Sequence, residues 1–447
     1  ASYDAEGVTV TQDGVTYTCD FLTDGTAHIE TPVADAGVTV MNVPTTIENA
    51  GKTYTVTEMY FGWSTKAANV EELHLPNTLT KMSGWGFNKF SKLKELAIPG
   101  SMRVFDFSLQ NMASLEKLTF EEGVEELAAN MMVSGCDKLK EINLPSSLKL
   151  ISQSGAFSGA SALESIELPE DVVFGDSTTG MFSDCTSLTS IVLPKSLTKI
   201  PTGYFSGCTS LASVTATSEI AEVGPKAFKN CSSLPEVSFP GTLTSIGYSA
   251  FEGCENLTSI PDLSHVSEMG ESAFQGCKRL FADVDLSSLA EIPAYAFCYA
   301  QVNVVKLSDT LRSIGKWAFI WGNLATDLPD TLESIGAYAF YAGSLPETFV
   351  IPDSVTSIGS NAFDSTEGVK EVRIGNGLTS ISDGLFDDST VEKIVIDNSE
   401  DDITGTDNLP AVEIVYLYES IDDDTGDTVS SEPGAMTLQE AVNAAPD

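Results

Sequence analysis

The stretch LTSIVLPKSLTKIPTGYFSGCTSL, residues 188–211, decides the fold. Within it, Ile191 and Leu193 are two residues apart, so both point to one side of a short strand while Val192 points to the other side. Pro194 has no N–H to donate and ends that strand. The first half of the stretch therefore predicts a short strand that is buried on one face.

The second half of the stretch closes a coil. Leu197 and Ile200 line a second short apolar segment, Phe205 follows, and a Gly-Cys turn ends at Cys208. A unit of this size cannot bury its apolar side chains alone, whereas stacked units cover one another and form a continuous core. The stretch therefore predicts one coil of a solenoid.

A phenylalanine, usually preceded by alanine, marks the repeat along the chain. It stands at Phe157, Phe182, Phe205, Phe228, Phe251, Phe274, Phe297, Phe319, Phe340, Phe363 and Phe386. The steps between these markers are 25, 23, 23, 23, 23, 23, 22, 21, 23 and 23 residues. Weaker copies of the marker extend backward to Met132, Leu109, Phe87 and Trp63. We expect an α/β solenoid that is rich in β-structure, a leucine-rich repeat array of about 15 coils of roughly 23 residues with a parallel β-sheet along one face.

These phrases resemble the BspA-like leucine-rich repeat family, whose pattern reads L-x-x-I-x-I-P-x-S-V-T-x-I-G-x-x-A-F-x-x-C. Residues 188–211 and the phrase VIPDSVTSIGSNAF at residues 350–363 carry the resemblance, which extends over roughly residues 38–396. It implies a bacterial protein that is secreted or exposed on the cell surface, with some members acting as adhesins toward host or matrix proteins. It implies no active site and names no ligand.

The repeat frame is missing at both ends of the chain. Residues 1–37 are expected to form an N-terminal β cap, with hairpin signals at Asp13-Gly14 and Asp24-Gly25, before the repeats of residues 38–396. Residues 397–430 are expected to form a C-terminal cap and an acidic loop, and residues 431–447 a tail or the start of a further domain.

Two acidic runs in the C-terminal part, residues 400–407 and 422–427, hold carboxylates of the kind that bind calcium. Neither run follows a calcium-loop spacing, so solvated loops are the preferred interpretation.

Charge and hydropathy exclude several partners. The 447 residues include 64 acidic and 23 basic side chains, and the net charge of −41 repels nucleic acids and anionic membranes. No apolar stretch approaches the roughly 18 residues of a membrane span. The chain opens at Ala1 without methionine, as a secreted chain does after its signal peptide is removed and as a chain shortened from a longer one also does. We expect an extracellular or cell-surface monomer.

Five cysteines follow the repeat. Cys185, Cys208, Cys231, Cys254 and Cys277 each stand three residues after a marker phenylalanine. Stacked in register, their side chains point in parallel, so a disulfide between neighbours is strained, and buried thiols are expected instead. Cys19, Cys136 and Cys298 fall outside this series.

The sequence carries no pattern of catalytic residues. His28, His74 and His265 are far apart and occupy unrelated positions in the repeat. Metalloprotease, hydrolase and phosphate-binding motifs are missing. We therefore expect that the chain is not an enzyme and that it has no cofactor and no metal site.

Two surfaces are candidates for binding. The first is the outward side of the parallel sheet, whose residues are mixed and mostly small; they are Ala97, Thr119, Asn143, Glu167, Val192, Thr215, Ser238, Asp285, Lys306, Val350 and Arg373. The second is a set of aromatic residues beside three consecutive markers, Tyr295, Tyr299, Trp317, Trp321, Tyr338 and Tyr341. These aromatic residues either form a platform for sugar rings or protein anchors, or fill space where the cysteines lapse and the repeats shorten.

The sequence thus favours a non-catalytic binding or adhesion protein that recognises host, matrix or neighbouring-cell proteins. One alternative is a structural stalk that presents a C-terminal domain. Another is a carbohydrate-binding module that uses the aromatic residues.

Overall fold

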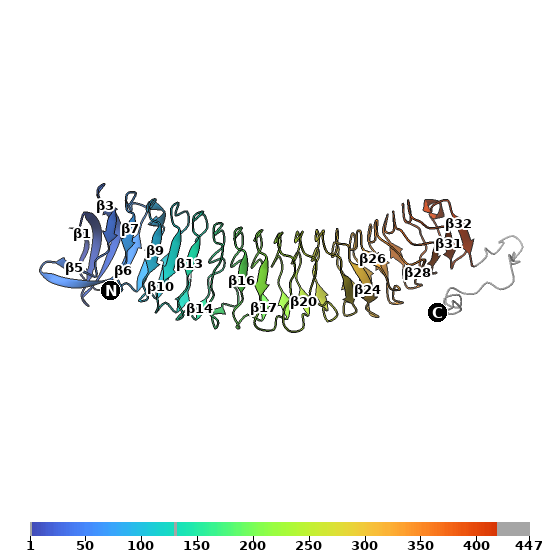
Figure 1. Ribbon diagram of the computed structural model, residues 1–447, viewed down its shortest axis with the longest axis horizontal. Coiled ribbons are helices and arrows are strands. Elements are labelled where there is room, and N and C mark those ends of the chain that lie inside the picture. Colours follow the sequence, from blue (N-terminus) through green and yellow to red (C-terminus); the bar gives the residue numbers. More distant parts are fainter. Residues whose placement is uncertain (1, 129–131, 418–447) are drawn as a thin grey trace, which may run out of the picture. The chain divides into compact units, whose positions relative to one another are not determined.

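The computed structural model describes residues 2–128 and 132–417, which form two compact units (Figure 1). Unit 1 holds the residues up to 220 together with 227–234 and 239–241, and unit 2 holds 221–226, 235–238 and the residues from 242 onward. The acidic run at residues 422–427 and the expected tail at residues 431–447 lie outside the described residues.

Both units are β-solenoids, with about 15 turns in all, and most coils add one strand to a main parallel ladder, which is divided into several short sheets. In unit 1 the main strands are β4 (Val40–Asn42), β7 (Glu72–His74), β9 (Glu95–Ile98), β11 (Lys117–Phe120), β13 (Glu141–Asn143), β16 (Ser190–Val192) and β18 (Ser213–Thr215). In unit 2 they are β22 (Asp283–Leu286), β24 (Asn303–Leu307), β26 (Asn323–Leu324), β28 (Thr348–Ile351), β30 (Glu371–Ile374), β31 (Lys393–Ile396) and β32 (Glu413–Tyr416). The register pairs equivalent repeat positions, as in Leu96, Leu118 and Ile142, which confirms the predicted parallel sheet.

A second ladder runs through the short segment of each coil. In unit 1 it comprises β6 (Lys52–Phe61), β8 (Lys81–Gly84), β10 (Val104–Phe107), β12 (Glu126–Leu127), β14 (Leu150–Ile151), β15 (Val173–Phe174) and β17 (Lys199–Ile200). In unit 2 it comprises β19 (Glu222–Val223), β20 (Ser245–Ile246), β21 (Glu268–Met269), β23 (Glu291–Ile292), β25 (Ser313–Ile314), β27 (Ser334–Ile335) and β29 (Ser357–Ile358).

The helical part of the predicted α/β class is minor. The described residues contain no α-helix, and their only helical segments are the 3₁₀ turns η1 (Gly86–Lys89) and η2 (Thr406–Asn408). In most coils the second segment is a two-residue strand, and the residues that follow it form turns. The solenoid is therefore almost entirely β.

An antiparallel meander precedes the coils. It consists of β1 (Tyr3–Gln12), β2 (Val15–Leu22) and β3 (Thr26–Ala34), with turns at Asp13-Gly14 and Asp24-Gly25, and β3 pairs in parallel with β6. A further hairpin joins β5 (Thr46–Asn49) to β6 and was not predicted from the sequence. The meander covers the edge of the second ladder that would otherwise be open.

The marker phenylalanines form a buried stack within each unit. In unit 2 the rings of Phe251 and Phe274 lie 5.1 Å apart with 3° between their planes, and those of Phe274 and Phe297 lie 5.2 Å apart with 4° between theirs. All of these rings are fully buried. The spacing equals roughly one strand separation, so the same ladder that pairs the strands also stacks the rings.

Two of the weaker markers were assigned wrongly. The coil before Phe157 uses Val133, because Leu109 donates to the carbonyl of residue 132 just as Phe157 donates to that of residue 181. Trp63 is 67% exposed and cannot be a core marker, whereas the ring of Phe61 lies 4.2 Å from that of Phe87. Spacing alone placed the first of these markers one residue too early. Phe61 does not replace Trp63 as a marker, because it pairs in register with Gly84, three residues before Phe87.

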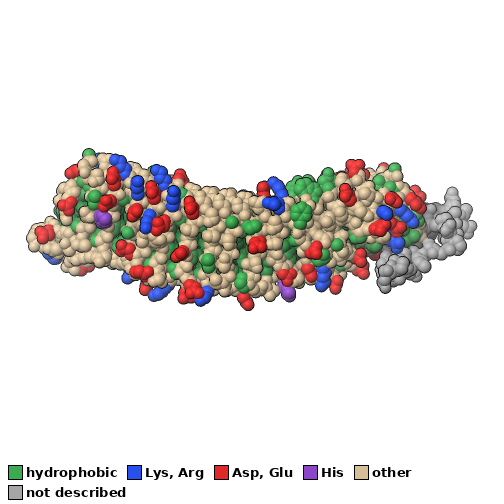
Figure 2. All heavy atoms as spheres, viewed as in Figure 1, with side chains coloured by type: hydrophobic (Ala, Val, Ile, Leu, Met, Phe, Trp, Pro, Cys, Tyr) green, Lys and Arg blue, Asp and Glu red, His purple; other side chains and the backbone are tan. Residues whose placement is uncertain are grey.

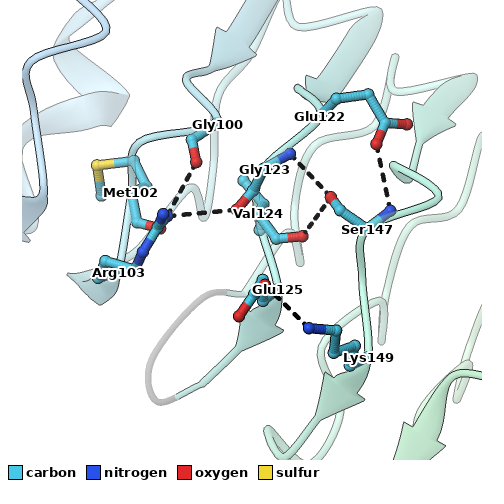
Figure 3. A network of polar contacts seen from close by, with 9 residues as sticks. All are labelled: Gly100, Met102, Arg103, Glu122, Gly123, Val124, Glu125, Ser147 and Lys149. Atoms are coloured by element: carbon cyan, nitrogen blue, oxygen red, sulfur yellow. Dashed lines mark hydrogen bonds and ion pairs between the residues drawn. The ribbon is translucent and has the colours of Figure 1, made fainter.

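Polar side chains form hydrogen bonds between neighbouring coils at the turns that follow β9, β11 and β13 (Figure 3). In unit 1, the Ser147 hydroxyl donates to the Val124 carbonyl at 2.8 Å and accepts from the Gly123 N–H at 2.9 Å. The Arg103 guanidinium donates to the carbonyl of Gly123 at 3.3 Å. The serine that follows proline in the repeat thus satisfies backbone groups that a turn leaves without partners.

All eight cysteines are free and buried, as was predicted for the five that follow the repeat. The thiols of Cys185, Cys208, Cys231 and Cys277 each donate to the carbonyl of the marker one coil earlier; for example, Cys208 bonds Phe182 at 3.0 Å and Cys277 bonds Phe251 at 3.3 Å. Cys136 makes the same bond to Leu109 at 3.0 Å, so it belongs to the series from which its spacing seemed to exclude it. These bonds satisfy carbonyl groups inside the coil that water cannot reach.

Candidate functional site: an aromatic cluster on left-handed backbone

Every marker turn from Phe157 to Phe386 contains two residues in the left-handed backbone conformation. The residue two before the marker has φ of 52–65°, and the residue two after it has φ of 50–79°. Both positions donate their N–H to the next coil; for example, Trp317 bonds the Ala337 carbonyl at 2.9 Å and Trp321 bonds the Tyr341 carbonyl at 3.1 Å. Because other coils make the same bonds with other side chains, the stack imposes this conformation and the side chain does not choose it.

Glycine and short polar residues occupy these positions in most coils, as a left-handed backbone favours. Five aromatic residues occupy them in three consecutive coils of unit 2. Tyr295, Trp317 and Tyr338 stand two residues before the marker, with φ of 59°, 59° and 56°, and Tyr299 and Trp321 stand two residues after it, with φ of 62° and 67°. For a bulky side chain this conformation is an outlier that costs about 1–2 kcal/mol per residue.

These five residues and Tyr341 form what we call the aromatic cluster, which the sequence predicted as a group. In the first row, the ring centroids of Tyr295 and Trp317 are 6.2 Å apart and those of Trp317 and Tyr338 are 4.9 Å apart. Tyr341 meets Tyr338 edge to face at 5.7 Å. In the second row, Tyr299 and Trp321 meet edge to face at 5.1 Å. The structure brings the six side chains together as two adjoining groups.

The aromatic cluster lies on the surface. Trp321 is 43% exposed and Tyr299 is 36% exposed, and the other four side chains are half-buried. Figure 2 shows hydrophobic side chains gathered at the upper edge of unit 2, over the coils that contain β24 and β26. Exposed, rigid aromatic side chains of this kind are typical of recognition sites.

The aromatic side chains do not fill the space that the missing cysteines leave. The cysteine position is taken by Ala300, Gly322 and Gly343, all buried, whose N–H groups bond the marker carbonyl as the cysteine N–H does. A Cβ on Gly343 would stand only 2.0 Å from the carbonyl oxygen of Gly322. Backbone from adjacent coils therefore closes the interior there.

The outward side of the main sheet offers no comparable group. Its predicted residues pair across the strands as expected, for example Ala97 with Thr119 and Val350 with Arg373. His74 lies on this side and its ring nitrogen is 3.3 Å from the Glu72 carboxylate. Small and charged side chains dominate, and no aromatic stripe crosses the sheet.

The described part of the chain offers little to catalysis. It contains no group of three or more histidine, cysteine or acidic side chains that could hold a metal ion. Burial raises the pKa of the Cys185 thiol to about 12 and that of Cys136 to about 11, so both thiols stay protonated and unreactive at neutral pH. None of the helical segments described in residues 2–128 and 132–417 could cross a membrane.

Sequence reasoning missed a second set of exposed aromatic residues, which lies in unit 1. Tyr60, Trp63 and Trp85 are 37%, 67% and 42% exposed. Gly62 and Gly84 make room for the Tyr60 ring, since a Cβ on either would stand 2.9 Å from it. Gly62, which follows β6, and Gly84, which ends β8, could have indicated this set in the sequence, but Trp63 had been interpreted as a core marker.

The sequence of the chain matches a protein-family model. The model described as "BspA type Leucine rich repeat region (6 copies)" matches residues 55–179, 154–281 and 290–406. The chain belongs to this family of leucine-rich repeat proteins.

One solved structure agrees on the fold. A leucine-rich repeat protein from Bacteroides ovatus is 24% identical over 81% of this chain and 94% of its own, with a TM-score of 0.60. A leucine-rich cell surface protein from Faecalibacterium prausnitzii is 17% identical over 96% of this chain and 99% of its own, with a TM-score of 0.35. Among curated proteins, none matches this chain.

Proposed function

We propose that this chain is a non-catalytic, extracellular or cell-surface binding protein that recognises a protein partner through the aromatic cluster. The observation that carries the proposal is the placement of five large aromatic side chains on left-handed backbone at the surface. Local strain that the fold does not need is a common mark of functional sites. Tryptophan and tyrosine are also the residues that most often dominate binding energy at protein interfaces.

The ring geometry favours a protein over a sugar. In the first row, the faces of Tyr295, Trp317 and Tyr338 are turned toward one another, with 28° and 36° between successive planes. A sugar ring that stacks on an aromatic residue needs a free face, whereas the edges that this row leaves open suit side chains of a protein partner. The membership of the chain in a bacterial repeat family and its net charge of −41 support a soluble, exposed setting.

A binding screen tests the proposal. The purified chain would be applied to a panel of immobilised extracellular-matrix proteins and to a glycan array, beside a Trp317→Asn/Trp321→Asn variant. Asparagine is a matched replacement, because Asn361 and Asn230 occupy the same two left-handed positions in other coils. Phe281→Asn is the control, since Phe281 is 65% exposed in unit 2 and lies outside the aromatic cluster.

The proposal expects saturable binding to a protein that the double variant loses and the control keeps. Binding to glycans alone, lost in the same variant, would instead identify a carbohydrate-binding module. Absence of binding to both panels would contradict the proposal and favour a structural stalk.

A further inference from the structure

We infer that the aromatic cluster receives a basic segment of its partner, whose lysine or arginine side chains lie over the acidic turns that follow the cluster. This inference rests on the proposed function and adds the chemistry of the partner. It is carried by the charges on both sides of the aromatic cluster along the same edge of unit 2.

Five carboxylates occupy the two marker turns that follow the aromatic cluster; this acidic flank consists of Asp364, Glu367, Asp383, Asp387 and Asp388. All are exposed except Asp364, which is half-buried. Within residues 2–128 and 132–417, none of them forms an ion pair with lysine or arginine, whereas the exposed Lys370 nearby pairs with Glu347 at 2.9 Å. The acidic flank thus carries negative charge that the described residues leave uncompensated.

Backbone bonds place the acidic flank directly beside the aromatic cluster. The N–H of Ala342, next to Tyr341, donates to the Asp364 carbonyl at 3.0 Å. One coil further, the N–H of Ser365 donates to the Asp387 carbonyl at 2.7 Å. A peptide of a few residues that rests on Tyr338 and Tyr341 can therefore reach the acidic flank.

The other side of the aromatic cluster is more nearly balanced in charge. The preceding marker turn carries Lys278, which pairs with Glu255 at 2.8 Å, and Arg279, which donates to Asn256. Lys316 lies over the Tyr295 ring, with its ammonium 5.5 Å from the ring centre. The preceding turns also hold acidic residues, Glu255 and Glu271, but Lys278 and Arg279 balance them there, so the uncompensated negative charge lies on the side of the acidic flank and gives a basic partner one preferred direction.

Short-range and long-range electrostatic attraction both favour a basic partner. The ring of Trp321, which is 43% exposed and lies outside the first row, can attract a lysine or arginine cation, as the Tyr295 ring attracts Lys316 within this chain. The net charge of −41 attracts cationic partners over long distances and accelerates their encounter at low salt. A basic segment with an apolar anchor satisfies both the aromatic cluster and the acidic flank.

Two synthetic peptides test the inference. Both contain the same tryptophan and leucine anchor; one carries four arginines and the other four glutamates, and binding is followed by fluorescence anisotropy of a peptide label. We expect the arginine peptide to bind at least ~10-fold tighter than the glutamate peptide at low salt, with an affinity that falls as salt rises.

Variants then locate the charge. Asp383→Asn/Asp387→Asn/Asp388→Asn is expected to weaken the arginine peptide by ~10-fold and to flatten its salt dependence. The matched control, Asp309→Asn/Asp327→Asn/Asp330→Asn, removes the same charge from aspartates that line a groove of about 630 Å³ at a different turn of unit 2, and should change affinity little.

The outcomes separate the inference from the proposed function. If both triple variants weaken binding equally, net charge alone attracts the peptide and the inference fails. If the glutamate peptide binds as well as the arginine peptide and Trp317→Asn/Trp321→Asn abolishes both, the aromatic cluster is a binding site but the inference fails. The inference is also wrong if the arginine peptide binds the Trp317→Asn/Trp321→Asn variant as tightly as the intact chain, or if neither peptide binds the intact chain.

Discussion

The coils that carry cysteine and the coils that carry the aromatic cluster build the same turn in two ways. Around Cys208 and Cys277, a thiol closes the interior by bonding a marker carbonyl, and the left-handed positions hold residues that suit them, such as Gly203 and Gly276. Around Phe319 and Phe340, backbone closes the interior at Gly322 and Gly343, and the left-handed positions hold tryptophan and tyrosine.

The difference shows which side chains the fold requires. Both kinds of coil keep the buried marker ring and the same bonds between coils, so these are general conditions of the stack. The aromatic side chains on left-handed backbone are not such a condition, because glycine, serine and asparagine serve elsewhere. We attribute them to recognition and the thiols to stability.

The largest expected effect is common to both kinds of coil. Phe274→Ala and Phe319→Ala should each lower the free energy of unfolding by about 3–5 kcal/mol, because each removes a fully buried ring from the stack. Chemical denaturation followed by circular dichroism measures both. A much smaller loss for Phe319→Ala would show that the aromatic coils do not share the core of the other coils.

The next effect tests how the interior is closed. Gly343→Cys restores a cysteine at its repeat position, but the new Cβ would stand 2.0 Å from the Gly322 carbonyl oxygen. We expect a loss of about 2–3 kcal/mol in the free energy of unfolding, since the adjacent backbone must move. Wild-type stability in this variant would mean that the two coils have room for a thiol after all.

A third effect is the pH dependence that a buried thiol gives to the free energy of unfolding. Burial raises the pKa of Cys185 to about 12, whereas an unfolded thiol titrates near ~8.5, so above that pH the unfolded chain loses a proton that the folded chain keeps. Stability is therefore full below pH ~8.5 and falls above it, by about 1.4 kcal/mol per pH unit for each such thiol.

The matched variant for this prediction is Cys185→Ala, which should flatten the decline in stability between pH 8.5 and 9.5 by that amount. Denaturation midpoints across this pH range give the measurement. An unchanged slope in the variant would show that the Cys185 thiol is accessible to solvent in the folded chain.

Much of the fold follows from the sequence, because one buried phenylalanine per coil and the two-residue spacing of Ile191 and Leu193 repeat too regularly to fit another architecture. The failures occurred where a small residue replaces a large one. Val133 was missed as a marker because the neighbouring Met132 is larger and nearly as well spaced, and Trp63 was chosen by spacing although its side chain is exposed.

The aromatic cluster was predicted as a group from spacing, but its meaning depends on backbone conformation. Nothing in the letters Trp317 or Trp321 shows that their φ angles are positive, since that follows from bonds between coils. A comparison of positions across coils could have supplied the hint, because glycine at residues 155, 180, 203 and 384 precedes its marker by the same two residues. The acidic flank likewise becomes visible only once neighbouring turns are known to stack.

The most direct test of this account is the stability of Trp317→Asn and Trp321→Asn, each measured by chemical denaturation without any ligand. The account predicts a free energy of unfolding within about 1 kcal/mol of the wild-type value, because relief of left-handed strain offsets the lost ring contacts. A loss of more than about 2 kcal/mol in either variant would contradict it, since these side chains would then serve packing rather than recognition.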